Sequence, residues 1–494
     1  MATSTRKRGM ARNRQLNVRT WVQKEGAYPG NQIAYLNKAK GQLRAGGVTV
    51  PVAGSNQVNR PSDTEYGDFQ PLGRTRTAPD LGTISVEQDL TIDQINWLEE
   101  IHMDNLPVAF HLLMGEGAPG NQNAWESKIV IPDADLSSFS YSDMQSADGD
   151  EILTIPAEFS YSAIHRAVRV TWNEIESATV TQPVTGAAFG KNRNTMYWIG
   201  QGDGSSVVPK FYHTTDGANI TALLLTGILS HTGENPTDLV YTGKYIIAPT
   251  GANSYIYAHE DSCTTTGGWT EVSTGFVGGA TPNAAYALNL ARVYFAAENG
   301  YIYVMTSIGS GVTVLQDGTL TTEDLNDIDG IGDTVVAVGD ANVVLVSQNN
   351  GETFSLIVGP IAATVLNTVS VIDDEIWYVG AADGNAYHTT DGGDTWSAAV
   401  GFTGAGAGSV TDIYFFKENP AFGLLCHSTA TPASRVYRTT DGGNTWENES
   451  LTGFPTSDAV NNVAMWDANT MIAGGIADTA TDGFVAIAKT ARSS

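Results

Sequence analysis

Short apolar runs alternate with clusters of glycine, aspartate, asparagine and threonine along the C-terminal part of the chain. One stretch reads TVSVI (368–372), EIWYVG (375–380), NAYHTT (385–390) and, after a tryptophan, SAAVGF (397–402). Runs of this length, bounded by turn-forming residues, are typical of β-strands. The stretch therefore predicts a unit of three or four short strands.

A turn-like segment recurs after the third strand of this unit. HTTDGGDTW (388–396) and RTTDGGNTW (438–446) are nearly identical, and the weaker copies HTTDGANIT and SQNNGETF begin at positions 213 and 347. In each copy an aromatic or apolar residue stands four places before the aspartate or its substitute: Tyr212, Leu345, Tyr387 and Tyr437. The shared spacing indicates one repeated unit rather than separate motifs.

The same register identifies two degenerate copies, with Tyr257 before Asp261 and Tyr303 before Ser307. A further copy is expected near Ala491, after the apolar run FVAIAK (484–489). A period of about forty to fifty residues is typical of repeat architectures. A four-stranded unit of this size cannot bury both faces alone, so neighbours must stack. Seven such units predict a seven-bladed β-propeller over residues 177–494.

The repeated segment has the chemistry of a tight turn. Asp391 can bond backbone amides two or three residues on, Gly392 and Gly393 supply positive φ angles, and Trp396 can fold back onto the strand pair. We predict structural turns at Asp216, Gly217, Asn349, Gly351, Thr353, Phe354, Asp391, Gly392, Gly393, Thr395, Trp396, Asp441, Gly442, Gly443, Thr445 and Trp446.

These residues resemble the Asp-box (BNR) repeat of sialidases, sortilin-type receptors and a photosystem II assembly factor. The resemblance covers residues 181–494 and implies that the turn is structural and lies on the outer rim, away from any central cleft. Because the last copy ends after its third strand, we expect the preceding segment SATVTQ (177–182) to supply the outer strand of the seventh blade.

Glycosidase chemistry of the sialidase type needs three arginines, a tyrosine nucleophile with an acidic helper, and an acid/base aspartate. Residues 181–494 hold only Arg193, Arg292, Arg435, Arg438 and Arg492. Two of these lie at or beside a repeated turn and one lies in the terminal tail. We therefore expect no enzymatic activity and no cofactor.

The sequence shows no metal-binding motif of recognised spacing. The histidines are scattered, and His213 and His388 each begin a repeated turn, which suggests a rim position. The acidic stretch EDLNDIDGIGD (323–333) fails the EF-hand pattern, because Leu325 and Val336 fall at the first and twelfth ligand positions. We predict no metal site, although a weak surface calcium site remains open.

Charge is divided unevenly along the chain. Of 494 residues, 26 are Lys or Arg and 53 are Asp or Glu, yet residues 1–46 hold ten bases and one acid, Glu25. We predict an assembly arm over residues 1–46 that uses Arg6, Lys7, Arg8, Arg12, Arg14, Arg19, Trp21, Lys24, Lys38, Lys40 and Arg44. Three interpretations of the arm stay open: docking on a neighbouring copy, a solvated disordered tail, or nucleic-acid binding.

The sequence contains neither a recognisable targeting signal nor a pair of cysteines that we expect to form a disulfide. The basic N-terminus is not followed by the apolar segment of a secretory signal, and no apolar run reaches the length of a membrane span. Cys263 and Cys426 fall in different predicted blades, so we expect no disulfide between them. These features predict assembly in a cytoplasm, without membrane contact.

Residues 47–176 predict a separate domain. A strand (82–90) precedes an amphipathic helix (92–104), whose apolar face holds Ile92, Ile95, Trp97, Leu98 and Ile101. Strands follow at 107–115, 128–144, 152–164 and 167–172. This order resembles the tube domain of long-tailed bacteriophages and related contractile injection systems, a β-sandwich or barrel-like domain with one flanking helix.

That resemblance implies a structural virion protein. Its subunits would form rings, hexameric in this family, that stack into a tail tube, contact other tail proteins and let DNA pass through the lumen without specific binding. The propeller would face outward, with weak contact to host glycans. In the alternative interpretation, the propeller is a glycan- or protein-binding module or, with less support, a glycosidase, and the N-terminal domain anchors it.

Overall fold

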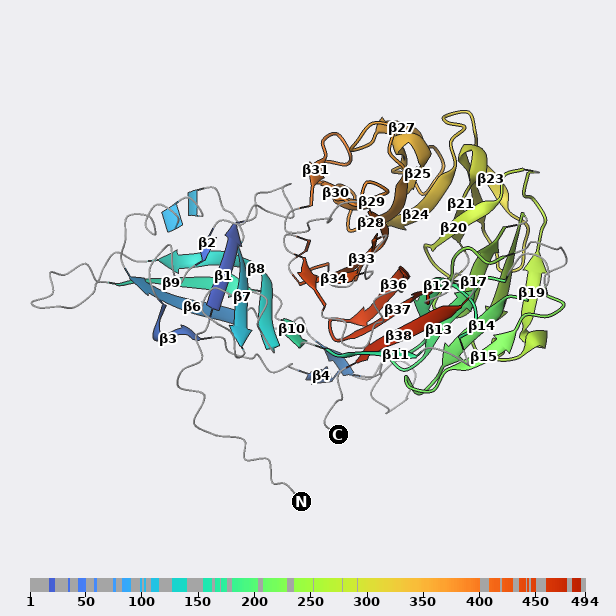
Figure 1. Cartoon of the computed structure of the whole chain (residues 1–494). Coiled ribbons are helices and arrows are strands. Elements are labelled where there is room, and N and C mark those ends of the chain that lie inside the picture. Colours follow the sequence, from blue (N-terminus) through green and yellow to red (C-terminus); the bar gives the residue numbers. More distant parts are fainter. Residues whose placement is uncertain are drawn as a thin grey trace, which may run out of the picture. The chain divides into compact units, whose positions relative to one another are not determined.

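The computed structural model divides the chain into two compact units, residues 1–169 and 170–494. In the first unit it describes the strands given next and four helical residues. In the second it describes residues 170–489 except 176–179, 203–207, 229–234, 252, 278, 291, 400–407, 418–419, 430–434, 441, 444–445, 450–458 and 478–481. Figure 1 shows the chain with its strands labelled.

The first unit contains an eight-stranded antiparallel sheet with the order β2-β1-β7-β8-β9-β6-β3, in which β10 also pairs with β8. Its strands are β1 (Asn17–Val22), β2 (Ala34–Tyr35), β3 (Leu43–Thr49), β6 (Gly82–Asp89), β7 (Val108–Met114), β8 (Ser127–Phe139), β9 (Thr154–Tyr161) and β10 (His165–Val168). A separate hairpin pairs β4 (Gln57–Asn59) with β5 (Arg74–Arg76).

The predicted helix 92–104 is described at four positions, Leu98, Glu99, His102 and Met103, all of which are helical. Leu98 is only 2 % exposed and Met103 is 81 % exposed, so the helix has a buried and a solvent face. This pattern fits the amphipathic face that the sequence predicts.

The predicted boundary between a separate arm and the domain at residue 46 is wrong for the described strands. β1 pairs with β7, β2 pairs with β1, and β3 pairs with β6, so all three belong to the sheet of the first unit. The boundary at 46 also cuts through β3 (Leu43–Thr49). The physical reason is that strand pairing is settled by long-range register, which charge content does not reveal.

The second unit holds seven four-stranded antiparallel sheets within the residues that the structure describes. The first three blades are β12 (Val184–Phe189), β13 (Met196–Gly200), β14 (Lys210–Thr214) and β15 (Thr221–Leu224); β16 (Val240–Tyr241), β17 (Tyr245–Thr250), β18 (Ser254–His259) and β19 (Trp269–Val272); and β20 (Pro282–Ala287), β21 (Val293–Ala297), β22 (Tyr301–Met305) and β23 (Thr313–Asp317). Short 3-10 turns are η3 (Thr266–Gly268), η4 (Glu298–Gly300) and η5 (Asp340–Asn342).

The next three blades follow in the same order, and each runs strand by strand from the inside of the ring outward. They are β24 (Leu325–Ile331), β25 (Thr334–Gly339), β26 (Val343–Ser347) and β27 (Ser355–Val358); β28 (Leu366–Val371), β29 (Trp377–Ala381), β30 (Ala386–Thr389) and β31 (Ser397–Ala398); and β32 (Gly408–Phe415), β33 (Gly423–Thr429), β34 (Arg435–Thr439) and β35 (Glu447–Asn448). The strands of the fifth blade follow the runs predicted from the sequence.

The seventh blade is completed by a strand from the start of the unit. It contains β36 (Ala459–Asp467), β37 (Thr470–Ile476), β38 (Gly483–Lys489) and β11 (Trp172–Ile175), in the order β11-β38-β37-β36. The expectation that a preceding segment closes this blade is confirmed, but the segment is 172–175 rather than 177–182. The strand 167–172 that we predicted is split, because β10 ends at Val168 and β11 begins at Trp172.

The seven sheets form a closed ring, a β-propeller. The first strand of each blade contacts the first strand of the next, from β12 through β16, β20, β24, β28 and β32 to β36, and β36 contacts β12. Figure 1 shows this succession as a colour change from green through yellow to red. Closure leaves few free sheet edges, which is the usual advantage of this architecture.

The core lies between the faces of neighbouring sheets. Val336 and Val344 of the fourth blade pack in one cluster with Val369 and Trp377 of the fifth. Trp198 and Trp377 are fully buried, as expected for residues on inner strands. Complete burial of a side chain such as that of valine contributes roughly 1.5–3 kcal/mol to folding. The packing of neighbouring blades is therefore the main source of stability.

Candidate functional site

The repeated turns, here called clasps, join the third and fourth strands of a blade. In the fifth blade, Asp391 Oδ1 accepts hydrogen bonds from the Thr395 amide at 2.8 Å and the Thr389 hydroxyl at 2.8 Å. Asp391 Oδ2 accepts from the Thr395 hydroxyl at 2.6 Å. The carboxylate therefore holds both ends of the turn, although its amide partner lies four residues on rather than the predicted two or three.

Two weaker copies are closed by the same side-chain position, but only the Asn349 copy bonds the amide four residues on, as Asp391 does. Asp216 Oδ1 accepts from the amides of Ala218 and Asn219, both at 2.9 Å. In the fourth blade an amide replaces the carboxylate: Asn349 Oδ1 accepts from the Thr353 amide at 3.0 Å, and its Nδ2 donates to the Thr353 hydroxyl at 2.9 Å.

A hydroxyl two places before the aspartate completes each clasp, and the sequence analysis missed it. The hydroxyls of Ser347, Thr389 and Thr439 accept from the amides of Gly351, Gly393 and Gly443, at 2.7–2.8 Å. Thr214 plays the same part for Gly217 at 3.0 Å. The signal was present in the sequence, since the four clearest copies all have Ser or Thr at this position, whereas the degenerate copies have His259 and Met305 there.

The predicted glycines adopt the left-handed conformation. Gly392 and Gly393 have φ angles of 68° and 91°, and Gly442 and Gly443 have 66° and 84°. Gly217 and Gly351 have 69° and 75°. Side chains with a Cβ are strained there, so glycine is required. Asp441 and Thr445 lie outside the described residues.

Clasps also bind the preceding blade, which was not expected. The Tyr294 hydroxyl of the third blade donates to the Asn350 carbonyl of the fourth at 2.8 Å, and the Tyr378 hydroxyl of the fifth donates to the Gly442 carbonyl of the sixth at 3.0 Å. Trp396 lies 6.4 Å from Trp377 and donates to the Val358 carbonyl of the preceding blade at 3.1 Å. Trp446 is buried, and Phe354 packs in the core.

The clasp carboxylates are ordinary structural acceptors in their electrostatics as well. Hydrogen bonds from Asn219 and Thr214 lower the pKa of Asp216. Partial burial acts to raise the pKa of Asp391, but bonds from Thr395 and Thr389 together hold it below its ordinary value. Both groups are ionised at neutral pH, so neither is a proton donor for catalysis.

A second set of polar side chains connects the blades at the inner end of the ring. In every blade one Thr or Asn side chain donates a hydrogen bond of 2.8–3.2 Å to a backbone carbonyl of the next blade. The accepting carbonyl lies on the first strand of that next blade, except in the second blade, where it lies just before the first strand. The pairs of this inner belt are Thr185–Pro236, Thr237–Pro282, Asn283–Leu325, Asn326–Leu366, Asn367–Val410, Thr411–Val460 and Asn462–Val184.

The inner belt has its own repeated sequence, which the sequence analysis did not use. An apolar residue followed directly by the donor Thr or Asn stands at 184, 236, 282, 325, 366 and 410; in the seventh blade Asn461 follows Val460 and the donor is the next residue, Asn462. In six blades the register shifts next to this residue, as at Leu325/Asp327, which marks a β-bulge. In five of these blades, the first and the third to sixth, the residue skipped by the pairing is the donor itself. A bulge turns a side chain out of the ladder, which explains how these donors reach the neighbouring blade.

Three carboxylates strengthen this contact in alternate blades. Asp238, Asp327 and Asp412 follow the belt residue, and each accepts from an amide of the next blade at 2.8–3.0 Å: Ala285, Val369 and Val463. The first blade has Gly186 instead, because a Cβ there would collide with the backbone of Leu239. These carboxylates are structural acceptors between blades.

Burial shifts the titration of the three inner carboxyls. Burial raises the pKa of Asp412 to about 7, although the Val463 amide opposes the shift. Burial also raises the pKa of Asp238 and of Asp327, and the other two carboxyls of the set add to the shift of Asp327. The residues are nevertheless partly solvent-accessible, so solvent reaches this part of the ring.

One lysine side chain contacts two other blades near the end of the inner strands that lies opposite the inner belt. Lys417, after β32, pairs with Asp329 of β24 at 2.6 Å and also donates to the Gly330 carbonyl. Its ammonium lies 4.6 Å from the centre of the Tyr286 ring on β20. Lys417 therefore ties the sixth blade to the fourth and third.

The described residues offer no metal centre, since none of them form a group of three His, Cys, Asp or Glu able to hold an ion. The acidic stretch 323–333 contains the inner strand β24, and Asp327 and Asp329 accept from the amides of Val369 and Val371. Burial lowers the pKa of His388 to about 4 and that of His213 as well. Cys263 and Cys426 are free and buried.

The predicted arm residues are only partly described. Arg19 and Trp21 lie in β1, and Arg44 lies in β3. The others, Arg6, Lys7, Arg8, Arg12, Arg14, Lys24, Lys38 and Lys40, lie outside the described residues, as does the seventh turn expected near Ala491. In the part of the chain that is described, no helix is long and apolar enough to cross a membrane.

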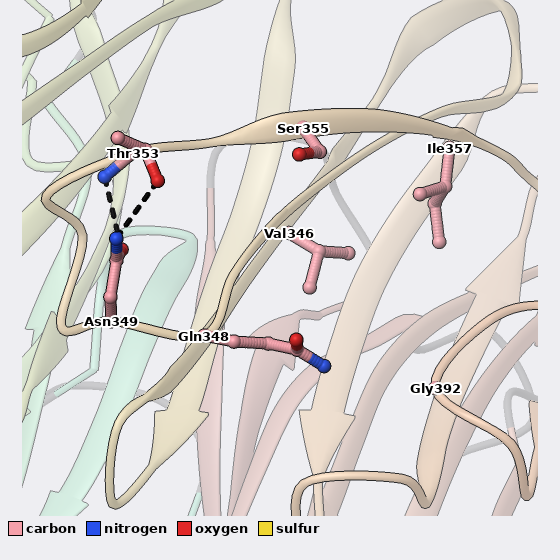
Figure 2. A pocket seen from close by; sticks show the side chains of 7 residues that line it. All are labelled: Val346, Gln348, Asn349, Thr353, Ser355, Ile357 and Gly392. Carbon is pink, nitrogen blue, oxygen red and sulfur yellow. Dashed lines mark hydrogen bonds between the residues drawn. The ribbon is translucent and has the colours of Figure 1, made fainter.

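A groove of about 390 Å³ opens at the clasp of the fourth blade. It is lined by Val346, Gln348, Asn349, Thr353, Ser355, Ile357 and, from the next blade, Gly392. Figure 2 shows Val346, Ser355 and Ile357 along the groove, with Gly392 on the side away from Asn349. No lining residue is charged.

Comparison with solved structures supports the fold of the second unit. The chain resembles YCF48 from Cyanidioschyzon merolae, with a TM-score of 0.50 and 13 % identity over 65 % of this chain and 98 % of that one. It resembles the RRP9 WD40 repeats equally, with a TM-score of 0.50 and 10 % identity over 65 % of this chain and 97 % of that one. No protein-family model and no curated protein matches the chain. At this identity the likeness shows the fold alone: the chain contains a β-propeller.

Proposed function

We propose that this chain is a self-assembling structural subunit of a phage tail tube that carries its propeller as an outward decoration. The observation that best supports this proposal is the order of the strands in the first unit. Strand β6, the four described helical residues (98, 99, 102 and 103) and strands β7, β8, β9 and β10 follow the order on which the tube-domain resemblance rests. β6 to β9 also pair in one antiparallel sheet, which can supply the wall of a ring.

The propeller supports a structural rather than catalytic role. Arg193 donates to the Thr470 hydroxyl at 2.6 Å, and Arg292 donates to the Asn350 carbonyl at 2.6 Å. Arg438 pairs with Glu449 at 2.7 Å, with both side chains buried. These arginines lie in three different blades and hold local partners, so they do not form the carboxylate-binding triad of a sialidase. We propose that the protein is not an enzyme and needs no cofactor or metal.

We also propose that the clasp is an Asp box. The support is that Asp216, Asn349 and Asp391 each accept a hydrogen bond from a hydroxyl two places earlier, and that each also accepts from at least one backbone amide of the turn. In this proposal the clasps fasten neighbouring blades and take no part in ligand chemistry.

The tail-tube proposal implies which molecules this chain would contact. Copies of this chain would form rings, hexameric by the resemblance, that stack and bind other tail proteins in a virion assembled in the host cytoplasm. DNA would pass through the lumen without specific contacts. The overall net charge of −27 supports this point, because a strongly acidic protein repels the phosphate backbone.

The test is the assembly state of the purified full-length chain. Light scattering should give a mass of several subunits, and negative-stain electron microscopy should show rings or tubes. A chain that stays monomeric at high concentration with its N-terminus intact would overturn the proposal. Deletion of residues 1–16 tests the arm better than deletion of 1–46, because β1, β2 and β3 belong to the sheet.

A second candidate function is a glycan- or protein-binding module, and the groove beside Asn349 favours it. Within the described residues the Gln348 amide and the Ser355 hydroxyl of this groove have no hydrogen-bond partner. Screening the full chain on a glycan array would separate the candidates. Saturable glycan binding by a monomer would favour the module over the tube.

A further inference from the structure

The outer edge of the fourth blade is a strand beside the groove, and within the described residues it receives one hydrogen bond from the next blade, from the Trp396 indole to the Val358 carbonyl. β27 (Ser355–Val358) is the last strand in the order β24-β25-β26-β27, and no described strand pairs with its other side. Leu356 and Val358 are 47 % and 82 % exposed. Natural edge strands are usually guarded by charge or proline, and β27 has neither. An edge of this kind can accept an extended segment as an additional strand.

The charged residues around the groove determine which kind of segment would bind there. Residues 293–416 contain sixteen Asp or Glu and no Lys or Arg. At the clasp end of the fourth and fifth blades, four exposed residues carry carboxylates that have no partner among the described residues: Glu352, Asp374, Glu375 and Asp394. A basic segment would therefore be attracted to this rim.

The bases nearest to this rim in the sequence are already engaged. Arg292 donates to the Asn350 carbonyl and lies 5.4 Å from the Tyr294 ring centre, and Lys417 pairs with Asp329. Neither is available to neutralise the four carboxylates. The four carboxylates are therefore open to a basic segment from elsewhere in the chain or from another molecule.

The chain itself contains a segment of matching character. Residues 1–16 carry Arg6, Lys7, Arg8, Arg12 and Arg14 and no acid, and they lie outside the described residues. In an extended strand, side chains alternate between two faces. Arg12 and Arg14 would then share one face toward the carboxylates, while the small or polar Ala11, Asn13 and Gln15 share the other, toward the uncharged groove.

We propose that residues 1–16 of a second copy dock as an added strand along β27, in the groove between the clasps of the fourth and fifth blades. The inference rests on the proposed self-assembly, because the occupant comes from another copy. It gives the propeller a role in assembly: its acidic rim receives the basic arm and links subunits outside the tube wall.

A labelled peptide of residues 1–16, added to the full-length chain, tests the site. Saturable binding is expected, and it should weaken at least ten-fold when salt rises from about 0.05 M to about 0.5 M, since screening shortens the reach of the charges. The double variant Asp374→Asn with Asp394→Asn should weaken binding several-fold. The matched control, Asp317→Asn with Glu323→Gln, removes two exposed carboxylates from the opposite end of the strands and should leave binding unchanged.

The edge itself is tested by Val358→Arg and Leu356→Arg. Both side chains are exposed, so the fold should persist, and each added charge should abolish peptide binding if the segment pairs along β27. Binding that survives both substitutions would show that only bulk charge attracts the peptide and would overturn the docking site.

Cross-linking decides whether the contact joins two copies. A chain with Glu352→Cys is mixed with a chain carrying Arg12→Cys, the native cysteines being buried. A disulfide-linked heterodimer is expected, whereas replacing Glu352→Cys by Asp317→Cys should give none. If tubes form but this cross-link does not, the docking site is rejected and the proposed function stands. If the cross-link is strong but no tubes form, the docking site stands and the proposed tube function is rejected.

Discussion

At the scale of single residues, one side chain can close a turn that the backbone alone would leave open. Asp391 accepts three bonds, from the Thr395 amide, the Thr395 hydroxyl and the Thr389 hydroxyl. Gly392 and Gly393 provide the positive φ angles that let the chain reverse. Removing the carboxylate should therefore lower the stability of the fold.

Asp391→Ala should lower the free energy of unfolding by about 1–2 kcal/mol, the usual loss for a side chain that holds backbone amides at a turn. Asp394→Ala is the matched control, because Asp394 is exposed and its carboxylate has no partner among the described residues. The control should change stability by less than about 0.5 kcal/mol. Urea denaturation of both variants gives the comparison, and equal losses would contradict a structural role for the clasp carboxylate.

The raised pKa of Asp412 gives the propeller a pH dependence. Burial raises this pKa to about 7 in the folded state, above the ordinary value of 3.8. The folded state then binds more protons, so this group contributes stability that is full below about pH 4 and is lost as the pH rises to about 7. The slope is at most about 1.4 kcal/mol per pH unit.

Asp412→Asn mimics the protonated carboxyl and should remove that component. Thermal unfolding at several pH values between about 4 and 7 checks it. The variant should show a flatter stability profile than the parent, with Asp317→Asn, an exposed residue, as control. A variant whose profile matches the parent would show that Asp412 does not titrate in this window.

At the scale of strands, the blades are held by two tiers of contacts. The clasps connect blades at the rim, and the inner belt connects them at the first strands. Both tiers use side chains to satisfy backbone groups of the neighbouring blade. Since an unpaired buried carbonyl costs free energy, each belt donor stabilises the ring.

Asn367→Ala should destabilise the propeller by about 1–3 kcal/mol, because the Val410 carbonyl loses the 2.8 Å bond from Asn367 Nδ2. Asn385→Ala is the control: its amide bonds Asp383 within a single exposed turn. The two free energies of unfolding, measured in urea, should differ clearly. A loss confined to Asn385→Ala would contradict the importance of the belt.

The sequence predicted the elements better than their connections. Strand runs such as 385–390 and the turn at Asp391 depend on local pattern, and β30 and the clasp lie where expected. The closing strand was placed at 177–182 instead of 172–175, because two short polar–apolar segments look equally suitable until one is paired with β38. The inner belt was missed because Thr or Asn after an apolar residue is too common to notice without aligned blades.

At the scale of the molecule, closure of the ring depends on a strand far away in the sequence. β11 pairs with β38 through Trp172–Ala488 to Ile175–Val485. Without it, the longer apolar strand β38 would become the outer edge of the seventh blade. Free edges invite pairing with other chains, so closure also protects against aggregation.

Two truncated chains test this closure. Residues 170–494 keep β11, whereas residues 177–494 lack it. We expect the longer chain to unfold cooperatively and remain soluble, and the shorter one to have a lower melting temperature by several degrees and to aggregate. Circular dichroism and light scattering measure both properties. Equal behaviour of the two chains would show that β11 is not needed.

The most direct measurement is a cryo-electron microscopy map of the purified full-length chain at high concentration. The account predicts stacked rings built from the N-terminal unit, each subunit bearing a closed disc of seven blades. Isolated monomers, or assemblies in which only propellers touch and the N-terminal units contact no sister subunit, would contradict it.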